Sequence, residues 1–234
     1  MKERPETLWV LAGIGAIAAL IAFADRTVYV WMEGLDGLLI QALRDITQIG
    51  NARWYLFGMP VVFAVALWLR ERAAGDLALA LDGVMAVTGF VFLAVALSGI
   101  ATNVLKFAIG RARPKLLDEA GIYGLSPFSL DHAYQSLPSG HTTTLFAVAA
   151  ALACLAPRWR IAFYTLALLL AASRTAVGAH YPSDLVAGAM VAIGSVLLLR
   201  RGLARCGLVF RELPGGRLVP KPSVAALAAA LRRS

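Results

Sequence analysis

Six long apolar stretches recur along this chain of 234 residues, and few charges interrupt them. A helix needs about 20 apolar residues to cross a bilayer, within a range of roughly 17–25. The second and sixth stretches are short, so flanking residues are needed to complete a membrane-spanning length. The third is long enough to tilt or to project past the membrane. The pattern predicts six transmembrane helices, at residues 8–24, 54–69, 77–104, 141–157, 161–178 and 184–199.

The composition favours lipid as the solvent of these stretches. The chain is 59% hydrophobic and 15% charged, whereas soluble domains average about 45–50% apolar and about 25% charged residues. A core of this size has no room for so much apolar surface. No internal repeat or low-complexity tract divides the chain. The expected fold class is therefore all-α, a polytopic membrane helix bundle, with residues 1–234 forming a single domain.

The basic residues predict how the bundle is oriented, because cytoplasmic loops carry an excess of Lys and Arg. With the N-terminus inside, the inner segments are 1–7, 70–76, 158–160 and 200–234, and they hold 14 of the 22 Lys and Arg residues. All of the net charge of +8 then lies on the inner side. We expect a bacterial inner membrane protein with both termini in the cytoplasm. Its basic tail, residues 200–234, is expected to contact anionic lipid, and no nucleic acid partner is expected.

The first stretch has an alternative interpretation. Ala22-Phe23-Ala24 resembles a signal-peptide cleavage site, and cleavage there would leave the other five stretches oriented as before. Four tryptophans lie near stretch ends, as interfacial tryptophans do. These are Trp9, Trp54, Trp68 and Trp159.

Two segments outside the six stretches carry weaker signals. Residues 35–46 have leucines at helical spacing opposite charged residues, which predicts a short extracytoplasmic amphipathic helix on the outer surface, with an irregular loop as the alternative. The tail contains Pro214-Gly215-Gly216 and Pro220, which favour a loop followed by a short helix.

Polar residues concentrate beside the ends of three stretches. In the predicted topology, residues 106–114 follow the outward-running third stretch and residues 138–141 precede the inward-running fourth. Residues 174–184 connect the fifth stretch to the sixth. All three clusters therefore meet at the outer, periplasmic face, although they are spread over 79 residues of the chain.

These clusters contain the groups that hold a phosphate monoester. An Arg guanidinium binds phosphate oxygens in a planar, bidentate way, and the start of a helix offers backbone N–H groups and a favourable dipole. The same donors stabilise charge on a phosphoryl group during its transfer. The candidate phosphate ligands are Lys106, Arg113, Ser139, Gly140 and Arg174.

The two histidines of the clusters can divide the chemistry between them. One attacks phosphorus as a neutral imidazole, while the other protonates the leaving oxygen. Asp184 lies four residues after His180, within reach of its distal N–H, and can fix its tautomer. His180 is therefore the candidate nucleophile and His141 the candidate acid. No Cys/His pair has zinc-ligand spacing, and no metal or other cofactor is expected.

Three motifs carry these residues in order along the chain. They are Lys106-FAIGRA-Arg113-Pro114, Pro138-Ser139-Gly140-His141 and Ser173-Arg174-TAVGA-His180-YPS-Asp184. They resemble the K-x6-RP, PSGH and SR-x5-H-x3-D motifs of the type 2 phosphatidic acid phosphatase (PAP2) superfamily, over a motif core of residues 106–184. The resemblance implies a metal-independent phosphatase with a phosphohistidine on His180, Asp184 as its partner, His141 as the acid, and the candidate ligands above binding phosphate.

Other interpretations stay open from the sequence. The basic residues at 106–115 also suit interfacial anchors that extend to lipid headgroups, and Arg111 is a further candidate for the phosphate site. His132, in the loop 115–137, is expected to be solvated and incidental, although the loop itself is expected to set substrate selectivity.

The expected activity is hydrolysis of a lipid phosphomonoester or pyrophosphate. The candidate substrates are phosphatidylglycerophosphate, undecaprenyl pyrophosphate, phosphatidate and lipid A phosphate. The alternatives are a lipid phosphotransferase that uses an alcohol acceptor and a non-enzymatic lipid-phosphate transporter. The expected partners are the membrane lipid substrate and the bilayer, with no obligate protein partner.

Overall fold

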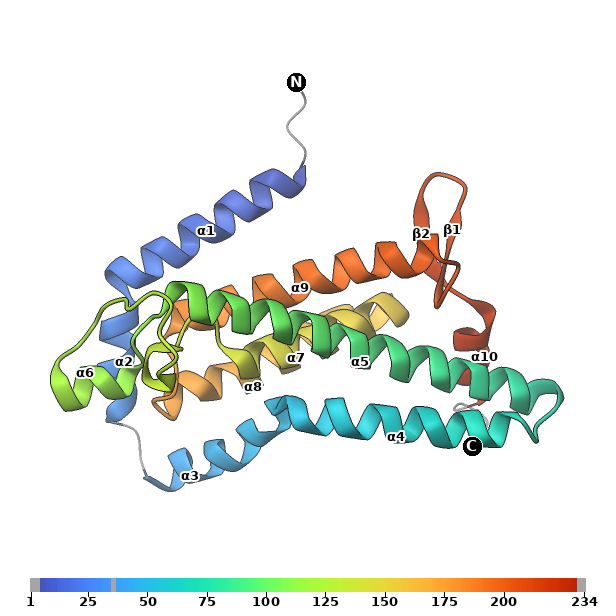
Figure 1. The fold of residues 1–234 in the computed structure, drawn as a ribbon, viewed down its shortest axis with the longest axis horizontal. Helices are drawn as coiled ribbons and strands as arrows, with labels where there is room; N and C mark the ends of the chain where they lie inside the picture. Colours follow the sequence, from blue (N-terminus) through green and yellow to red (C-terminus); the bar gives the residue numbers. More distant parts are fainter. Residues whose placement is uncertain (1–4, 35–36, 231–234) are drawn as a thin grey trace.

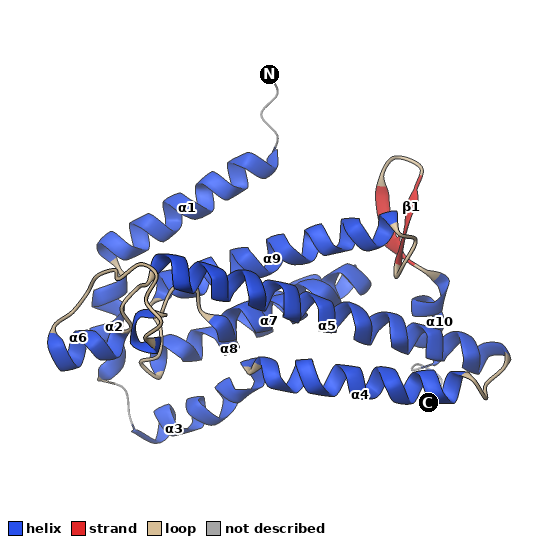
Figure 2. Ribbon diagram, in the orientation of Figure 1, coloured by secondary structure: helices blue, strands red, loops and turns tan. Residues whose placement is uncertain are grey.

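The computed structural model describes residues 5–34 and 37–230, and this part of the chain is mostly helical (Figures 1 and 2). The helices are α1 (Pro5–Phe23), α2 (Asp25–Glu33), α3 (Gly37–Ile46), α4 (Ala52–Arg70), α5 (Gly75–Ile109), α6 (Pro114–Ala120), α7 (Gly140–Leu155), α8 (Arg160–Ala176), α9 (Pro182–Arg205) and α10 (Pro222–Ala230). Short 3₁₀ turns lie at Thr47–Gly50 (η1), His132–Tyr134 (η2) and Pro157–Trp159 (η3). Strands β1 (Phe210–Leu213) and β2 (Arg217–Pro220) pair antiparallel.

Local sequence explains where several helices begin and end. Pro114 and Pro182 stand at the first position of α6 and α9, where the missing N–H of proline costs no helical hydrogen bond. The Asn51 side chain caps α4 by accepting from the Arg53 N–H at 3.1 Å. α5 ends at Gly110, which has the left-handed conformation that glycine adopts most readily.

Helices occupy all six of the predicted stretches, but their lengths differ. Within the described residues, α4, α5 and α9 are each long and apolar enough to cross a bilayer. α1 and α2 are long and apolar enough to cross a bilayer only when taken together, and the pair is bent by 59° at the break between them. α7 is apolar over 16 residues and α8 has 17 residues. Three or four spans therefore satisfy the length expected of a transmembrane helix.

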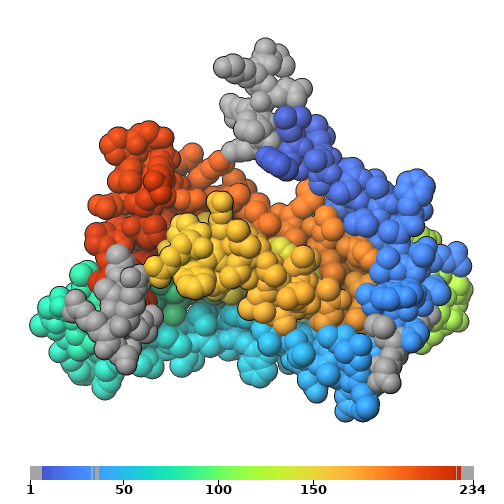
Figure 3. Space-filling view, turned by 180° about the vertical axis from the view of Figure 1, so that it is seen from behind, coloured from blue at the N-terminus to red at the C-terminus, as the bar shows by residue number. Residues whose placement is uncertain are grey.

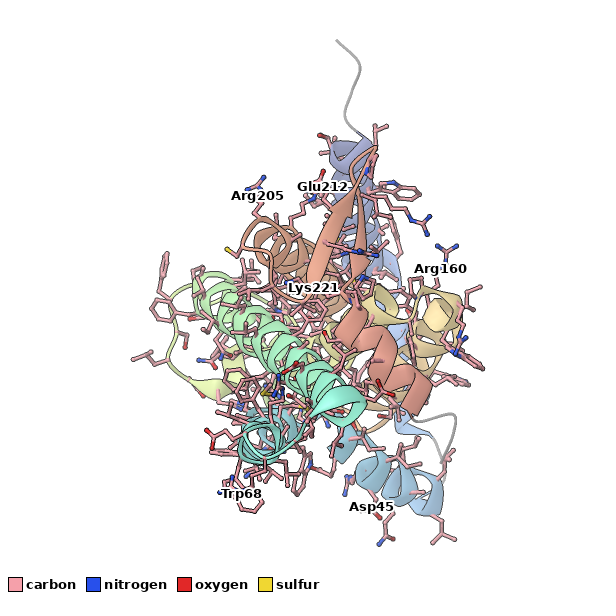
Figure 4. The ribbon with its side chains drawn as sticks, turned by 90° about the vertical axis from the view of Figure 1, so that its right-hand side faces the viewer. Asp45, Trp68, Arg160, Arg205, Glu212 and Lys221 are labelled. Carbon is pink, nitrogen blue, oxygen red and sulfur yellow. The ribbon has the colours of Figure 1, made fainter. Side chains whose placement is uncertain are left out.

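The outer surface of the bundle is apolar where a membrane would cover it. Only 6% of the apolar part of α4 is buried inside the protein, and Phe57, Val61 and Trp68 of this helix are exposed. Trp68 points away from the neighbouring helices in Figure 4. Apolar surface this extensive is stable in lipid and costly in water, so the chain is a membrane protein.

α7 lies at the centre of the bundle, where it packs against α5, α8 and α9. Small side chains at these contacts let the helix backbones approach closely, as in other membrane bundles. Buried alanines of α7 and α9 and larger residues of α5 form the core. They include Phe90, Val91, Ala94, Val95, Ala147, Ala150, Ala151, Ala192 and Val196.

The amphipathic helix predicted at residues 35–46 is confirmed as α3 over Gly37–Ile46, while Leu35 and Asp36 fall outside the described residues. No residue of α3 is buried, and Leu38 is 80% exposed. The helix therefore lies on the surface, as its pattern of leucines and charges predicts. The short helices α2 and α6 were not predicted, because each is only one or two turns and carries no long apolar run.

The prediction of a loop after residue 200 is wrong in part, so the fold is not purely helical. α9 continues to Arg205, and a β-hairpin then precedes α10. Gly215 and Gly216 both have positive φ, of 89° and 79°, which is the backbone that a tight hairpin turn requires. Phe210 of β1 is completely buried and packs edge-on against Phe90 of α5, with ring centroids 5.0 Å apart.

The two ends of the bundle differ in character. The α4–α5 turn, the hairpin and α10 lie at one end, and α2 and α6 lie at the other (Figure 1). Seen from the first end, Arg160 and Arg205 point away from the bundle (Figure 4). The three polar motifs lie in and around the loops at the second end.

We predict that Gly188→Ala destabilises the fold. A Cβ at Gly188 of α9 would lie 2.7 Å from the Ser139 carbonyl oxygen and 3.2 Å from Thr142 Cβ. Overpacking a tight helix contact typically costs about 1–3 kcal/mol. Thermal unfolding in detergent measures the effect. Gly194→Ala is the matched control on the same helix, because a Cβ there meets no atom within 4 Å; equal unfolding temperatures for the two variants would contradict the prediction.

Candidate active site

The site begins on one polar face of α5. Ser98, Thr102 and Lys106 follow each other at four-residue spacing and are all buried, so they form a line along the helix. Thr102 Oγ1 bonds Thr143 Oγ1 of α7 at 2.9 Å, which ties the two helices together. At the end of this line Lys106 Nζ donates to the carbonyl oxygens of two loop residues, Gln135 and Ser136.

The turn after α5 places two arginines on different sides of the chain. Gly110 has φ of +62°, and a Cβ there would lie 1.7 Å from the Ser126 carbonyl oxygen, so only glycine fits. The Ser126 N–H donates to the Gly110 carbonyl at 2.6 Å, and the Arg113 N–H donates to Ala133 at 2.8 Å. The loop 121–136 thereby folds back along residues 110–113, with Arg111 buried and Arg113 only half-buried.

Arg113 is held by the loop that follows it. Its Nε donates to the His132 carbonyl at 3.1 Å and its terminal nitrogen donates to the Gln135 carbonyl at 3.2 Å. His132 Nε2 lies 3.2 Å from the same terminal nitrogen. The charge of Arg113 is the main cause that lowers the pKa of His132, which favours a neutral ring that accepts this bond. His132 is exposed, as expected, and it contacts Arg113.

The PSGH motif forms the start of α7. Ser139 is the N-cap residue, and its Oγ accepts from the Thr142 N–H at 3.4 Å and from Thr142 Oγ1 at 3.0 Å. As the acceptor of both bonds, the Ser139 hydroxyl keeps its own hydrogen for another partner. A Cβ at Gly140 would lie 3.9 Å from Lys106 Cε. The N-terminus of α7 and the Lys106 side chain are therefore adjacent.

His180 and Asp184 lie together at the start of α9. His180 Nδ1 is 3.4 Å from Asp184 Oδ2, and the same oxygen accepts from Ser136 Oγ at 2.5 Å and from the Tyr181 N–H at 2.9 Å. His180 and Asp184 are buried. Because Nδ1 faces the carboxylate, Nε2 is the ring nitrogen left for chemistry.

Arg174 and His141 complete the site from α8 and α7. Arg174 donates to Thr47 Oγ1 at 3.4 Å, while its Nε is buried without a hydrogen-bond partner among the described residues. The charges of Arg174, Arg113 and Lys106 all act on the His141 ring. The three cations therefore lie near enough to His141 for their charges to act on its ring.

Burial is the main cause that lowers the pKa of His180, to about 3. The hydrogen bond and the charge of Asp184 oppose this change, whereas Lys106 and Arg113 add to it. Desolvation and nearby cations both disfavour the imidazolium form. His180 is therefore a neutral imidazole at physiological pH, as a nucleophile must be.

The excess of positive charge defines what the site can bind. Within the described residues, the hydrogen bonds of Lys106, Arg113 and Arg174 go to carbonyl and hydroxyl oxygens and to a histidine ring, and none goes to a carboxylate. A group of buried and half-buried cations without a carboxylate partner favours an anion with several oxygens. Among the described residues, no three His, Cys, Asp or Glu side chains are placed to hold a metal ion.

Several functional residues escaped the sequence analysis. Ser136 bonds the catalytic candidate Asp184, but it lies two residues before Pro138, outside the PSGH motif, and the sequence shows only an ordinary loop serine. Asp25 and Ser183 approach Arg111 from opposite ends of the chain. No motif or spacing connects Asp25 to the later clusters, so only the fold reveals it.

Comparisons with known proteins agree with this geometry. The family model described as the PAP2 superfamily matches residues 87–207. A lipid A 1-phosphatase of Rhizobium johnstonii is 40% identical over 173 residues, which are 73% of this chain and 70% of the relative. A lipid A 1-phosphatase of Rhizobium etli is 45% identical over 130 residues, which are 56% of each protein.

Two solved structures share the fold. The crystal structure of a PAP2 type phosphatidylglycerolphosphate phosphatase from Bacillus subtilis has a TM-score of 0.58 at 21% identity, and covers 88% of this chain and 98% of its own. The crystal structure of Aquifex aeolicus LpxE has a TM-score of 0.53 at 19% identity. The match covers 74% of this chain and 93% of LpxE. The relatives, the fold and the cationic site together define a phosphatase of membrane lipids. The chain belongs to the PAP2 superfamily, which confirms the resemblance seen in its motifs.

We predict that His180 stays neutral between pH 8 and pH 5. A pKa of about 3 lies below an unperturbed histidine value of about 6.5, so protonation requires a more acidic solution. ¹⁵N NMR of the histidine-labelled protein in detergent measures this, and the chain has only 3 histidines. The signal that disappears in His180→Asn belongs to this residue. A titration of that signal with a midpoint near pH 6.5 would show that burial does not lower the pKa of His180, and would contradict the prediction.

Proposed function

We propose that this protein removes a phosphate group from lipid A at the periplasmic face of a bacterial inner membrane, through a phosphohistidine intermediate. The observation that carries the proposal is the convergence of His180, His141 and three cations at one end of a membrane helix bundle. The choice of lipid A rests on the two relatives named lipid A 1-phosphatase, at 40% and 45% identity.

In the first step, His180 Nε2 attacks phosphorus. A nitrogen–phosphorus bond forms while the bond from phosphorus to the lipid oxygen breaks, and His141 donates a proton to that departing oxygen. A bound phosphate dianion beside His141 favours its protonated form, because opposite charge stabilises imidazolium. Asp184 holds the Nδ1–H of His180, so the attacking nitrogen keeps its lone pair.

The cations stabilise the phosphoryl group during its transfer. Lys106, Arg113 and Arg174 supply positive charge, and the start of α7 supplies backbone N–H groups. The unpaired Nε of Arg174 is a donor that a phosphate oxygen can satisfy. In the second step, water attacks the phosphohistidine with His141 as the base, and inorganic phosphate leaves.

The basic residues support the orientation in which the site faces the periplasm. Six transmembrane helices in this order leave both termini on the side opposite to the three motifs. That side carries most of the Lys and Arg residues of the chain, as the cytoplasmic side of an inner membrane protein does. A lipid of the outer leaflet then presents its phosphate directly to the site.

An apolar groove lies among three helices that also carry residues of the candidate site. It has a volume of about 520 Å³ and is lined by residues of α7, α8 and α9, including Tyr164, Ala171, Leu185 and Ala189. Ala171 lies one turn before Arg174, and Leu185 follows Asp184 directly. Figure 3 shows the molecule from behind, with α1 in blue rising away from α8 and α9. We propose that an acyl chain of the substrate occupies the groove while its phosphate binds the cations.

We predict that Ala189→Phe, which fills the groove, raises KM for the lipid substrate by about 10-fold, because one acyl chain loses apolar contacts of roughly 1.4 kcal/mol. The effect on KM should be much smaller for a water-soluble aryl phosphate, which has no acyl chain. Ala64→Phe is the matched control, since Ala64 is an exposed residue of α4 outside the groove. Equal effects of Ala189→Phe on the two substrates would contradict this placement.

We predict that the purified protein releases phosphate faster from lipid A than from phosphatidylglycerophosphate, undecaprenyl pyrophosphate or phosphatidate. Phosphate release in detergent micelles measures the four rates without added metal ion. His180→Ala should abolish release, because it removes the nucleophile, and it serves as the blank for every substrate.

Two further readouts separate the alternatives. Radiolabelled phosphate from the substrate should appear on the wild-type protein in an acid-labile form, as phosphohistidine does, and not on His180→Ala. Label that passes to an added alcohol and not to water would identify a phosphotransferase. Wild-type release by His180→Ala would disprove the assignment of the nucleophile.

A further inference from the structure

Arg111 forms a buried network behind the catalytic pair. One terminal nitrogen donates to Asp184 Oδ1 at 2.7 Å and to Ser183 Oγ at 2.6 Å. The other donates to Asp25 Oδ2 at 2.8 Å and to Tyr123 Oη at 3.0 Å. Both terminal nitrogens therefore point at these four partners. Arg111, a further candidate for the phosphate site from the sequence, is a partner of Asp184 instead.

Asp25 comes from the opposite end of the chain. It begins α2 at the bend after α1, and it is completely buried. Its Oδ1 accepts from the Ser183 N–H at 2.9 Å, and its Oδ2 accepts from Ser183 Oγ as well as from Arg111. The N-terminal helices therefore contribute a carboxylate to the immediate surroundings of Asp184.

We propose that Asp25 is a positioning residue for the phosphatase reaction, which shares the charge of Arg111 so that Asp184 keeps its negative charge for His180. This inference rests on the proposed function, because it assigns His180 as the nucleophile. Asp25 touches neither the substrate nor His180, and it acts through Arg111 and Asp184.

The charges of the network explain why a second carboxylate is needed. Two carboxylates and one guanidinium leave one net negative charge, and His180 is the imidazole bonded to the network among the residues that the structure describes. The His180 ring becomes positive as its bond to phosphorus forms, so that negative charge stabilises the transition state. If Asp25 carried no charge, Arg111 would pair with Asp184 alone and neutralise it.

The surroundings strengthen these interactions. The guanidinium of Arg111 lies 4.5 Å from the centre of the Tyr181 ring and 5.5 Å from that of Tyr123. Tyr123 Oη also donates to the Ile21 carbonyl of α1 at 3.0 Å, which fixes this ring against the N-terminal helix. Arg111, Asp25 and Asp184 are themselves almost completely buried, and charges interact more strongly where water is excluded.

The test compares Asp25→Asn with the wild type on the lipid that the wild type hydrolyses. We expect kcat to fall by about 10-fold or more with little change in KM, because the loss acts on the charge that develops at His180 and not on substrate binding. The ¹H resonance of the His180 Nδ1–H should move upfield, since its bond to a neutralised Asp184 is weaker. A merely structural role for Asp25 would not change this resonance in the folded variant.

Asp82→Asn is the matched control. It also removes a carboxylate from an Asp–Arg pair, because Asp82 Oδ1 lies 2.8 Å from Arg70 Nε, but this pair is at the other end of α5. Its kcat and its His180 resonance should equal those of the wild type. If Asp25→Asn does not fold, Asp25→Glu replaces it: the charge is kept, so kcat should stay within about threefold of the wild type.

The failure of this inference and the failure of the proposed function give different results. A folded Asp25→Asn protein with wild-type kcat and an unchanged His180 resonance would overturn the inference, even if His180→Ala is inactive as proposed. A loss of more than 10-fold in a folded Asp25→Glu protein would also overturn it. An active His180→Ala protein would overturn the proposed function, whereas the resonance of His180 tests the role of Asp25 without any turnover.

Discussion

The carboxylate of Asp184 is the interaction on which the site depends. Oδ2 binds His180, Ser136 and the backbone of Tyr181, and Oδ1 binds Arg111. The carbonyl oxygen of the same residue accepts from the Ser139 N–H at 2.9 Å, so Asp184 also holds the start of α7. One residue therefore joins all three motifs. A buried carboxylate is stable only when its oxygens are satisfied, and loss of one partner from a buried ion pair costs about 3–5 kcal/mol.

Two kinds of cation lie in and around the candidate site of this protein. Arg111 has two carboxylate partners, and both of its terminal nitrogens donate hydrogen bonds, so it is a structural charge. In the part of the chain that the structure describes, Lys106, Arg113 and Arg174 donate to no carboxylate. These three cations, and not Arg111, are therefore the candidate ligands of an anion.

Much of this arrangement could be predicted from the sequence, because its signals are local. Apolar runs predicted a helix at each of the six stretches, and the motifs predicted which family the chain belongs to. Contacts between distant residues could not be predicted. Arg111 looks the same in the sequence as its neighbour Arg113, yet after the turn at Gly110 Arg111 is buried and Arg113 is only half-buried. The hairpin was missed because paired glycines alone do not show where the flanking strands pack.

The tail after α9 has a mechanical consequence for the far end of the molecule. Ser223 and Leu227 of α10 pack so closely on Gly83 of α5 that a Cβ there would lie 2.4 Å from a backbone oxygen. α5 runs unbroken from this contact to Lys106, over about 35 Å at 1.5 Å per residue. A continuous helix transmits rotation about its axis along its whole length. α10 therefore packs on the same unbroken helix that carries Lys106, one end of which holds the tail and the other the site.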